Sequence, residues 1–88
     1  MKVKENLALR QVAGSWVVIP LSRKTLDFNG MLSLNETGVM LWHLLENECQ
    51  KEELVTALLN EYDVSKDIAS ADVDEFLQTL RKAGCLEE

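Results

Sequence analysis

The sequence has few of the residue types from which catalytic and metal sites are built. Its 88 residues include one histidine, two cysteines, one proline and four glycines. No apolar run approaches the roughly 18–20 residues that a membrane-spanning helix needs. The first residues also lack the apolar stretch and cleavage site of a secretory signal. These absences predict a cytoplasmic location, and the length predicts a single domain over residues 1–88.

Basic residues are scarce in the second half of the chain. Nine Lys and Arg stand against fifteen Asp and Glu, which gives a net charge of −6. Residues 1–45 carry five basic and three acidic groups, whereas residues 46–88 carry four basic and twelve acidic groups. A protein that binds a nucleic acid duplex or an anionic membrane neutralises phosphates with Lys and Arg. The charge pattern therefore disfavours both as partners.

The candidate chemical groups are isolated from one another. A zinc site takes three or four protein ligands, so the lone His43, in a stretch expected to be a buried helix, is predicted to be a hydrogen-bonded packing residue. Cys49 and Cys85 form no metal-binding pair and are expected to be reduced and at least partly buried. Acidic clusters fall on predicted solvent faces, and the glycines match no phosphate loop. We therefore expect no enzyme activity, no metal and no cofactor.

Two segments near the start predict a β-hairpin. Residues 7–13 alternate with a period of two, and residues 16–19 are bulky and β-branched before Pro20 ends the run. Between them, Gly14-Ser15 suits the centre of a two-residue type II′ turn.

A third strand is expected at residues 31–34. It follows Asn29-Gly30, the strongest short turn signal in the chain. The strand's partner is left open: it can pair with residues 17–21, with residues 26–28, or with both.

The rest of the chain predicts three helices. Apolar residues recur there at helical spacing, and capping residues mark the ends: Asn35 and Ser65 as N-caps, and Gly84 just past the last helix. The expected spans are about 35–47, 51–62 and 66–83. Gly38, in the first turn, is expected to let another backbone approach closely. The fold class is therefore α+β, a small N-terminal antiparallel three-stranded sheet packed on a three-helix cluster in a winged-helix-like arrangement.

Such a sheet leaves an edge of unpaired backbone N–H and C=O groups. An edge beside an amphipathic helix suits an extended peptide, which adds as a further strand and places alternate side chains in the strand–helix groove. If the N–H of Leu32 faces outward, a proline there should weaken peptide binding more than folding. The same edge permits pairing between two copies, so a homodimer is a further expected partner.

Three ordered blocks between residues 32 and 86 resemble the coenzyme PQQ synthesis protein D (PqqD) family. They are residues 34–45 (LNETG, then LWHLL), residues 53–64 (ELV, LL, then EYDV) and residues 71–86 (ADVDEFL, a single L, then AGCL). The segment from Ser22 to Phe28 and the Asn29-Gly30 turn have no counterpart in this pattern. The resemblance therefore implies the family's role in peptide recognition rather than the PQQ pathway itself.

The resemblance implies that this chain is a RiPP recognition element, which binds the leader of a ribosomally made precursor peptide. Such a peptide chaperone presents its guest to a modifying enzyme, often a radical SAM protein. In the family the leader adds to the third strand and packs against the third helix. Carried onto this sequence, the peptide-binding residues are Gly30, Met31, Leu32, Ser33, Leu34, Asp72, Glu75, Phe76, Thr79 and Leu80, with Leu80 at the floor of the groove and Phe76 equally suited to the core.

Two other functions remain open from the residues alone. A winged-helix DNA-binding regulator would share this fold, but neither of the last two predicted helices is studded with Arg, Lys, Asn and Gln for base edges. A non-catalytic structural subunit would have no peptide partner.

Overall fold

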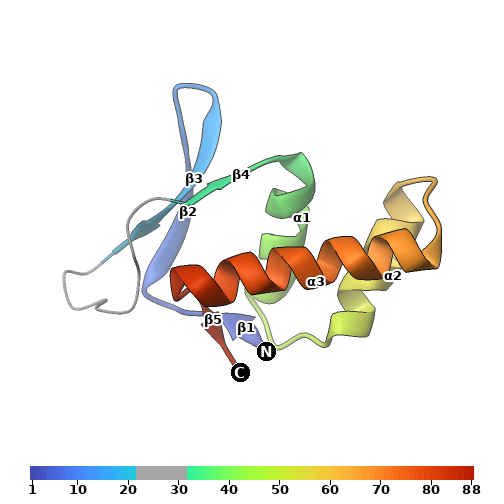
Figure 1. Cartoon of the computed structure of the whole chain (residues 1–88). Coiled ribbons are helices and arrows are strands. Elements are labelled where there is room, and N and C mark those ends of the chain that lie inside the picture. The colour runs from blue at the N-terminus through green and yellow to red at the C-terminus, as the bar shows by residue number, and fades with distance from the viewer. Residues whose placement is uncertain (22–31) are drawn as a thin grey trace.

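The computed structural model describes residues 1–21 and 32–88 of the chain (Figure 1). Its elements in chain order are β1 (Lys2–Val3), β2 (Leu7–Val12), β3 (Ser15–Pro20), β4 (Leu32–Leu34), α1 (Glu36–Leu45), α2 (Lys51–Glu61), α3 (Lys66–Ala83) and β5 (Leu86–Glu87). Strands β2, β3 and β4 form an antiparallel sheet in that order. The expected α+β class, with a three-stranded sheet and three helices, is confirmed. The predicted Asn29-Gly30 turn and a strand at 26–28 lie outside the described residues.

The hairpin of β2 and β3 projects away from the helices (Figure 1). Val12 pairs with Ser15, so the two turn residues are Ala13 and Gly14. Both have positive φ, 51° and 82°. Two successive positive φ values belong to a type I′ turn, whose twist matches that of the flanking strands. The predicted type II′ turn at Gly14-Ser15 is therefore wrong by one residue.

The main core lies between the three helices and one face of the sheet. Trp42 is its largest fully buried side chain, with 2 % of its surface exposed. Val18 enters from β3 and Leu45 from α1, and α2 and α3 contribute Leu54, Leu58, Val73, Leu77 and Leu80. No helix in the described part of the chain is long and apolar enough to cross a membrane.

The helix ends follow the capping residues. The Asn35 side chain accepts a hydrogen bond from the N–H of Gly38 at 2.8 Å, and Ser65 Oγ accepts one from the N–H of Ile68 at 3.2 Å. Gly84 is left-handed, with φ 77°, and ends α3. These bonds satisfy backbone groups that a helix end otherwise leaves without partners, so all three predicted caps are confirmed.

Helix α1 buries only one side, although its sequence is apolar almost all round. The buried stripe repeats at helical spacing and consists of Gly38, Leu41, Trp42 and Leu45. His43 lies off this stripe; its side chain is 58 % exposed, and Nδ1 lies 2.5 Å from Glu46 Oε1. The prediction of a buried packing histidine is therefore wrong, whereas the expected hydrogen bond is present.

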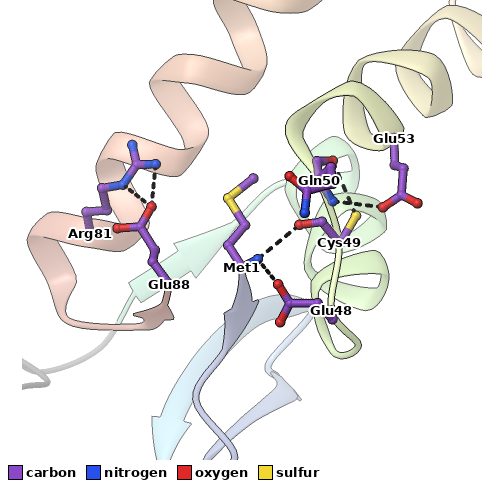
Figure 2. Close-up of polar contacts among 7 residues, drawn as sticks. All are labelled: Met1, Glu48, Cys49, Gln50, Glu53, Arg81 and Glu88. Carbon is purple, nitrogen blue, oxygen red and sulfur yellow. Dashed lines mark hydrogen bonds and ion pairs between the residues drawn. The ribbon is translucent and has the colours of Figure 1, made fainter.

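A second, two-stranded sheet joins the two ends of the described chain. β1 pairs with β5, and the N–H of Lys4 donates to the carbonyl of Cys85 at 2.9 Å. Figure 2 shows the neighbouring polar contacts, in which the Arg81 guanidinium donates to Glu88 and the nitrogen of Met1 contacts Glu48. These strands correct the expectation that all strands lie within residues 7–34, because two-residue strands are too short to show an alternating pattern.

Both cysteines are free and buried. Burial is the main cause that raises the pKa of the Cys85 thiol from 9.0 to about 11. Burial also raises the pKa of Cys49 to about 11, helped by the nearby carboxylate of Glu53. A thiol that resists ionisation and lies in the core is a poor nucleophile. The free, buried state of both cysteines agrees with the expectation that they are reduced and at least partly buried.

Replacing Trp42 with alanine tests the central position of α1. We expect Trp42→Ala to lower the free energy of unfolding by about 3–5 kcal/mol, because a cavity replaces a fully buried ring. Urea denaturation followed by far-UV circular dichroism measures the change. Leu44→Ala, at a side chain that is 39 % exposed on the same helix, is the control and should cost much less. A Trp42 variant with a wild-type midpoint would contradict the central placement.

Thiol reactivity tests the burial of the two cysteines. At pH 8 we expect both thiols to react slowly with dithionitrobenzoate in the folded protein and rapidly in denaturant. Because their folded pKa values lie above the unfolded value of 9.0, their contribution to stability is complete below pH 9 and is lost as the pH rises toward 11. Rapid reaction of either thiol under native conditions at pH 8 would show that the core opens there.

Candidate functional site

Strand β4 is an edge of the three-stranded sheet in the described chain. It pairs with β3 through Val18 with Leu32, Val17 with Ser33, and Trp16 with Leu34. Of the pairings left open by the sequence, the described residues show the one with β3. On the other side of β4 no strand of residues 1–21 or 32–88 pairs with it, and we call this side the open edge.

The register also determines which backbone groups of β4 face outward. The N–H of Leu21 donates to the carbonyl of Asn6 at 2.8 Å, so odd-numbered residues of β3 direct their backbone groups toward β2. Successive residues of a strand alternate in this direction, so Trp16 and Val18 face β4. Their partners Leu34 and Leu32 face back toward β3, and the N–H and C=O of Ser33 point to the open edge.

This geometry corrects the expectation for Leu32. Its N–H points into the sheet, toward β3, so a proline at Leu32 would disturb folding rather than a bound peptide. The residue of β4 whose backbone N–H faces outward is Ser33, and its side chain is also exposed.

A hollow of about 360 Å³ lies beside the C-terminal end of β4, between the start of α1 and one face of α3. The α3 face contributes Asp72, Glu75, Phe76 and Thr79; the α1 side contributes Asn35, Thr37, Gly38 and Leu41. Four of the predicted groove residues on α3 are therefore together in one hollow. Its remaining wall was missed by sequence reasoning, because it comes from residues assigned only to the structure of α1.

Gly38 is the point at which β4, α1 and α3 meet. A Cβ atom at this position would lie 3.3 Å from Leu34 Cβ, from Asn35 Oδ1 and from Phe76 Cε1. The glycine thus permits a close approach, as expected, but the neighbours are side chains rather than another backbone. Phe76 is half-buried there: it packs against the core and also lines the hollow.

The rim of the hollow is acidic. Asp72 and Glu75 are both exposed and lie on one face of α3. Their neighbour Asp74 is neutralised by Lys51, whose Nζ lies 2.9 Å from Asp74 Oδ1. Asp72 and Glu75 form no ion pair with another residue of the described part. The Thr79 hydroxyl donates to the Glu75 carbonyl at 3.0 Å, which leaves its methyl group for packing.

Three other residues were predicted to contact the peptide, and the described structure does not place them in this hollow. Leu80 is fully buried in the main core and does not line this hollow. Gly30 and Met31 lie outside the described residues.

The opposite edge of the sheet, β2, also adjoins a hollow. It is lined by mixed charges from Lys4, Glu5, Arg10 and Glu46, together with His43 and apolar residues. Among residues 1–21 and 32–88 no group of three His, Cys, Asp or Glu side chains is placed to hold a metal ion. The β4 edge is the better candidate, because the charged residues of the hollow beside it are all acidic, whereas the hollow beside β2 carries charges of both signs.

Known proteins resemble this chain over nearly its whole length. A solved structure described as "TbiB1 in Complex with the TbiA(beta) Leader Peptide" shares 26 % sequence identity over 99 % of this chain and 95 % of that one, with a TM-score of 0.78. A "Lasso peptide synthetase B1 complexed with the leader peptide" shares the fold, at 17 % identity over 99 % of this chain and 96 % of that one, with a TM-score of 0.76. No curated protein matches the sequence. The family model for coenzyme PQQ synthesis protein D (PqqD) matches residues 15–86, so the chain belongs to the PqqD family.

Proposed function

We propose that the chain is a leader-peptide-binding chaperone, a RiPP recognition element, that captures a ribosomal precursor peptide by strand addition to β4. The observation that carries this proposal is the outward backbone of Ser33 beside a hollow lined by Asp72, Glu75, Phe76 and Thr79. The backbone of β4 would supply the ladder, and alternate guest side chains would enter the hollow. Both similar structures are described as complexes with leader peptides, which supports the same role here.

The proposed role is non-catalytic, and residues 1–88 act as one peptide-recognition domain. The bound peptide is then presented to a separate modifying enzyme, such as a radical SAM protein, in the cytoplasm. Two free, buried thiols are consistent with a reducing compartment. Pairing of two β4 edges in a homodimer would occupy the same backbone groups, so a dimer of that kind would compete with the peptide.

A direct test starts from a displayed library of random 20-residue peptides, selected on the full chain. We expect enrichment of peptides that bind the wild-type chain and are lost on a variant with a blocked edge. Failure of any peptide to enrich above an unrelated protein of equal charge would contradict the proposal. A gel shift with random-sequence DNA duplexes at low salt tests the alternative of a DNA-binding regulator; a shift with no peptide enrichment would favour that alternative.

Ser33→Pro tests the open edge. The variant removes the outward N–H and places a ring where the guest strand would lie, so we expect the affinity for a selected peptide to fall by at least about tenfold. The urea midpoint should change little, since edge strands tolerate proline on their solvent side.

Two controls accompany this variant. Ser33→Ala keeps the N–H and should bind like the wild type. Leu32→Pro removes an N–H directed at β3 and should lower stability. Equal affinities of Ser33→Pro and the wild type, measured by fluorescence anisotropy, would rule out strand addition at this edge.

Charge reversal tests the acidic rim. We expect Asp72→Lys combined with Glu75→Lys to weaken binding of a selected Lys- or Arg-containing peptide by about threefold to tenfold at low salt. The difference should shrink near 0.5 M salt, where charges on a surface are screened. The pair Glu52→Lys and Glu61→Lys changes the net charge equally, on the exposed face of α2, and is the matched control. If both pairs lowered affinity alike, only the net charge of the protein would matter.

A further inference from the structure

A second, smaller hollow continues the first along α3 toward the N-terminus of that helix. It has a volume of about 200 Å³ and is lined by Thr37, Leu58, Tyr62, Val64 and Asp72. Thr37 and Asp72 also line the hollow beside β4, so the two hollows share a wall. The smaller hollow therefore adjoins the larger one at Thr37 and Asp72 and extends to Val64, in the connection between α2 and α3.

The smaller hollow is apolar at its base and held in shape by hydrogen bonds. The Thr37 hydroxyl donates to the Tyr62 hydroxyl at 3.0 Å, which ties the start of α1 to the end of α2. The N–H of Tyr62 donates to the Leu58 carbonyl at 2.9 Å. Tyr62 and Val64 nevertheless expose 39 % and 36 % of their surface, so apolar area remains open to a guest.

The occupant follows from what lies next to this hollow. Asn35 continues β4 in an extended conformation up to the start of α1. Thr37 lies two residues after Asn35 and, with Asp72, lines both hollows, so a peptide that pairs with β4 and extends past Asn35 would approach the smaller hollow there. The volume is on the scale of one large side chain, and the Asp72 carboxylate at the junction favours a nearby positive charge.

We propose that the bound peptide inserts one bulky apolar side chain, from the segment just outside its β-strand, between Leu58, Tyr62 and Val64. A Lys or Arg of the peptide lies next to this anchor and faces Asp72. The inference rests on the proposed function and adds a determinant of sequence selectivity. A backbone ladder discriminates poorly between sequences, whereas a side-chain pocket at a fixed distance from it selects among them.

The test applies the random-peptide selection described above to the wild type and to two matched variants. Val64→Asp places a carboxylate inside the smaller hollow. Ile68→Asp makes the same change at a side chain that is 53 % exposed and lines neither hollow. Each protein is used to select peptides, and one wild-type-selected peptide is also made with its apolar anchor replaced by serine.

We expect peptides selected on the wild type and on Ile68→Asp to share a bulky apolar residue at a fixed spacing from their strand segment, with Lys or Arg beside it. Replacing that residue by serine should cost at least about tenfold in affinity on these two proteins and less than about twofold on Val64→Asp. Urea midpoints of the two variants show whether both remain folded.

Every outcome decides between the two proposals. The smaller hollow is not the anchor site if Val64→Asp selects peptides with the same anchor residue as the wild type. The same holds if the serine substitution lowers the affinity of the peptide equally for all three proteins. In both cases the proposal of peptide capture at the β4 edge stands. If peptides bind but share no anchor residue, the inference is likewise overturned. If no peptide enriches on the wild type, the proposed function fails, and the inference fails with it.

Discussion

The close approach of three elements at Gly38 is the constraint on which the rest of the site depends. With side-chain atoms of Leu34, Asn35 and Phe76 all 3.3 Å from where a Cβ would be, a side chain at this position would require these neighbours to move by a few tenths of an ångström. That proximity brings the start of α1, which directly follows β4, against Phe76 of α3. It therefore places an open backbone edge and an acidic, partly apolar hollow next to each other. Either feature alone would be an ordinary surface; together they form a surface suited to an extended peptide.

Local sequence signals predicted the elements well where a single residue determines the geometry. Asn35, Ser65 and Gly84 end or begin helices through hydrogen bonds within three or four residues, so their roles can be recognised without knowing the fold. The predicted hairpin turn, Gly14-Ser15, lies one residue after the observed turn, because Ala13 adopts a positive φ that its residue type disfavours. There the twist of the paired strands outweighs the local preference of one alanine.

Signals that depend on packing partners were harder to interpret. His43 lies between Trp42 and Leu44 in an apolar run, yet α1 turns only one stripe toward the core and leaves His43 exposed. Sequence composition shows how apolar a helix is but not how many neighbours cover it. The pairing of β1 with β5 was not predicted for a similar reason: each strand is only two residues long, and only the fold brings the two strands together.

The α3 side of the candidate site could be predicted and the α1 side could not. Asp72, Glu75, Phe76 and Thr79 recur at spacings of three and four, so they share one helix face whatever the helix packs against. Leu80 lies four residues after Phe76, but it belongs to the stripe of α3 that faces the core, together with Ala69, Val73 and Leu77, and it is fully buried. Thr37 and Leu41 belong to another element, and only the approach at Gly38 makes them part of the same hollow.

The brevity of β4 determines how such a site must divide its binding energy. A strand of three residues with one outward-facing position offers few backbone hydrogen bonds, each with a net value of about 1 kcal/mol. A ladder that short cannot by itself hold a peptide tightly or select its sequence. In the proposed role, selectivity would then come from side-chain contacts along α3 and at its N-terminal end, and the acidic rim would raise the rate of encounter with a basic guest. If the chain passes its peptide to an enzyme, as proposed, this division has a physical advantage: a weak ladder permits release, and the side-chain contacts determine which peptide is carried.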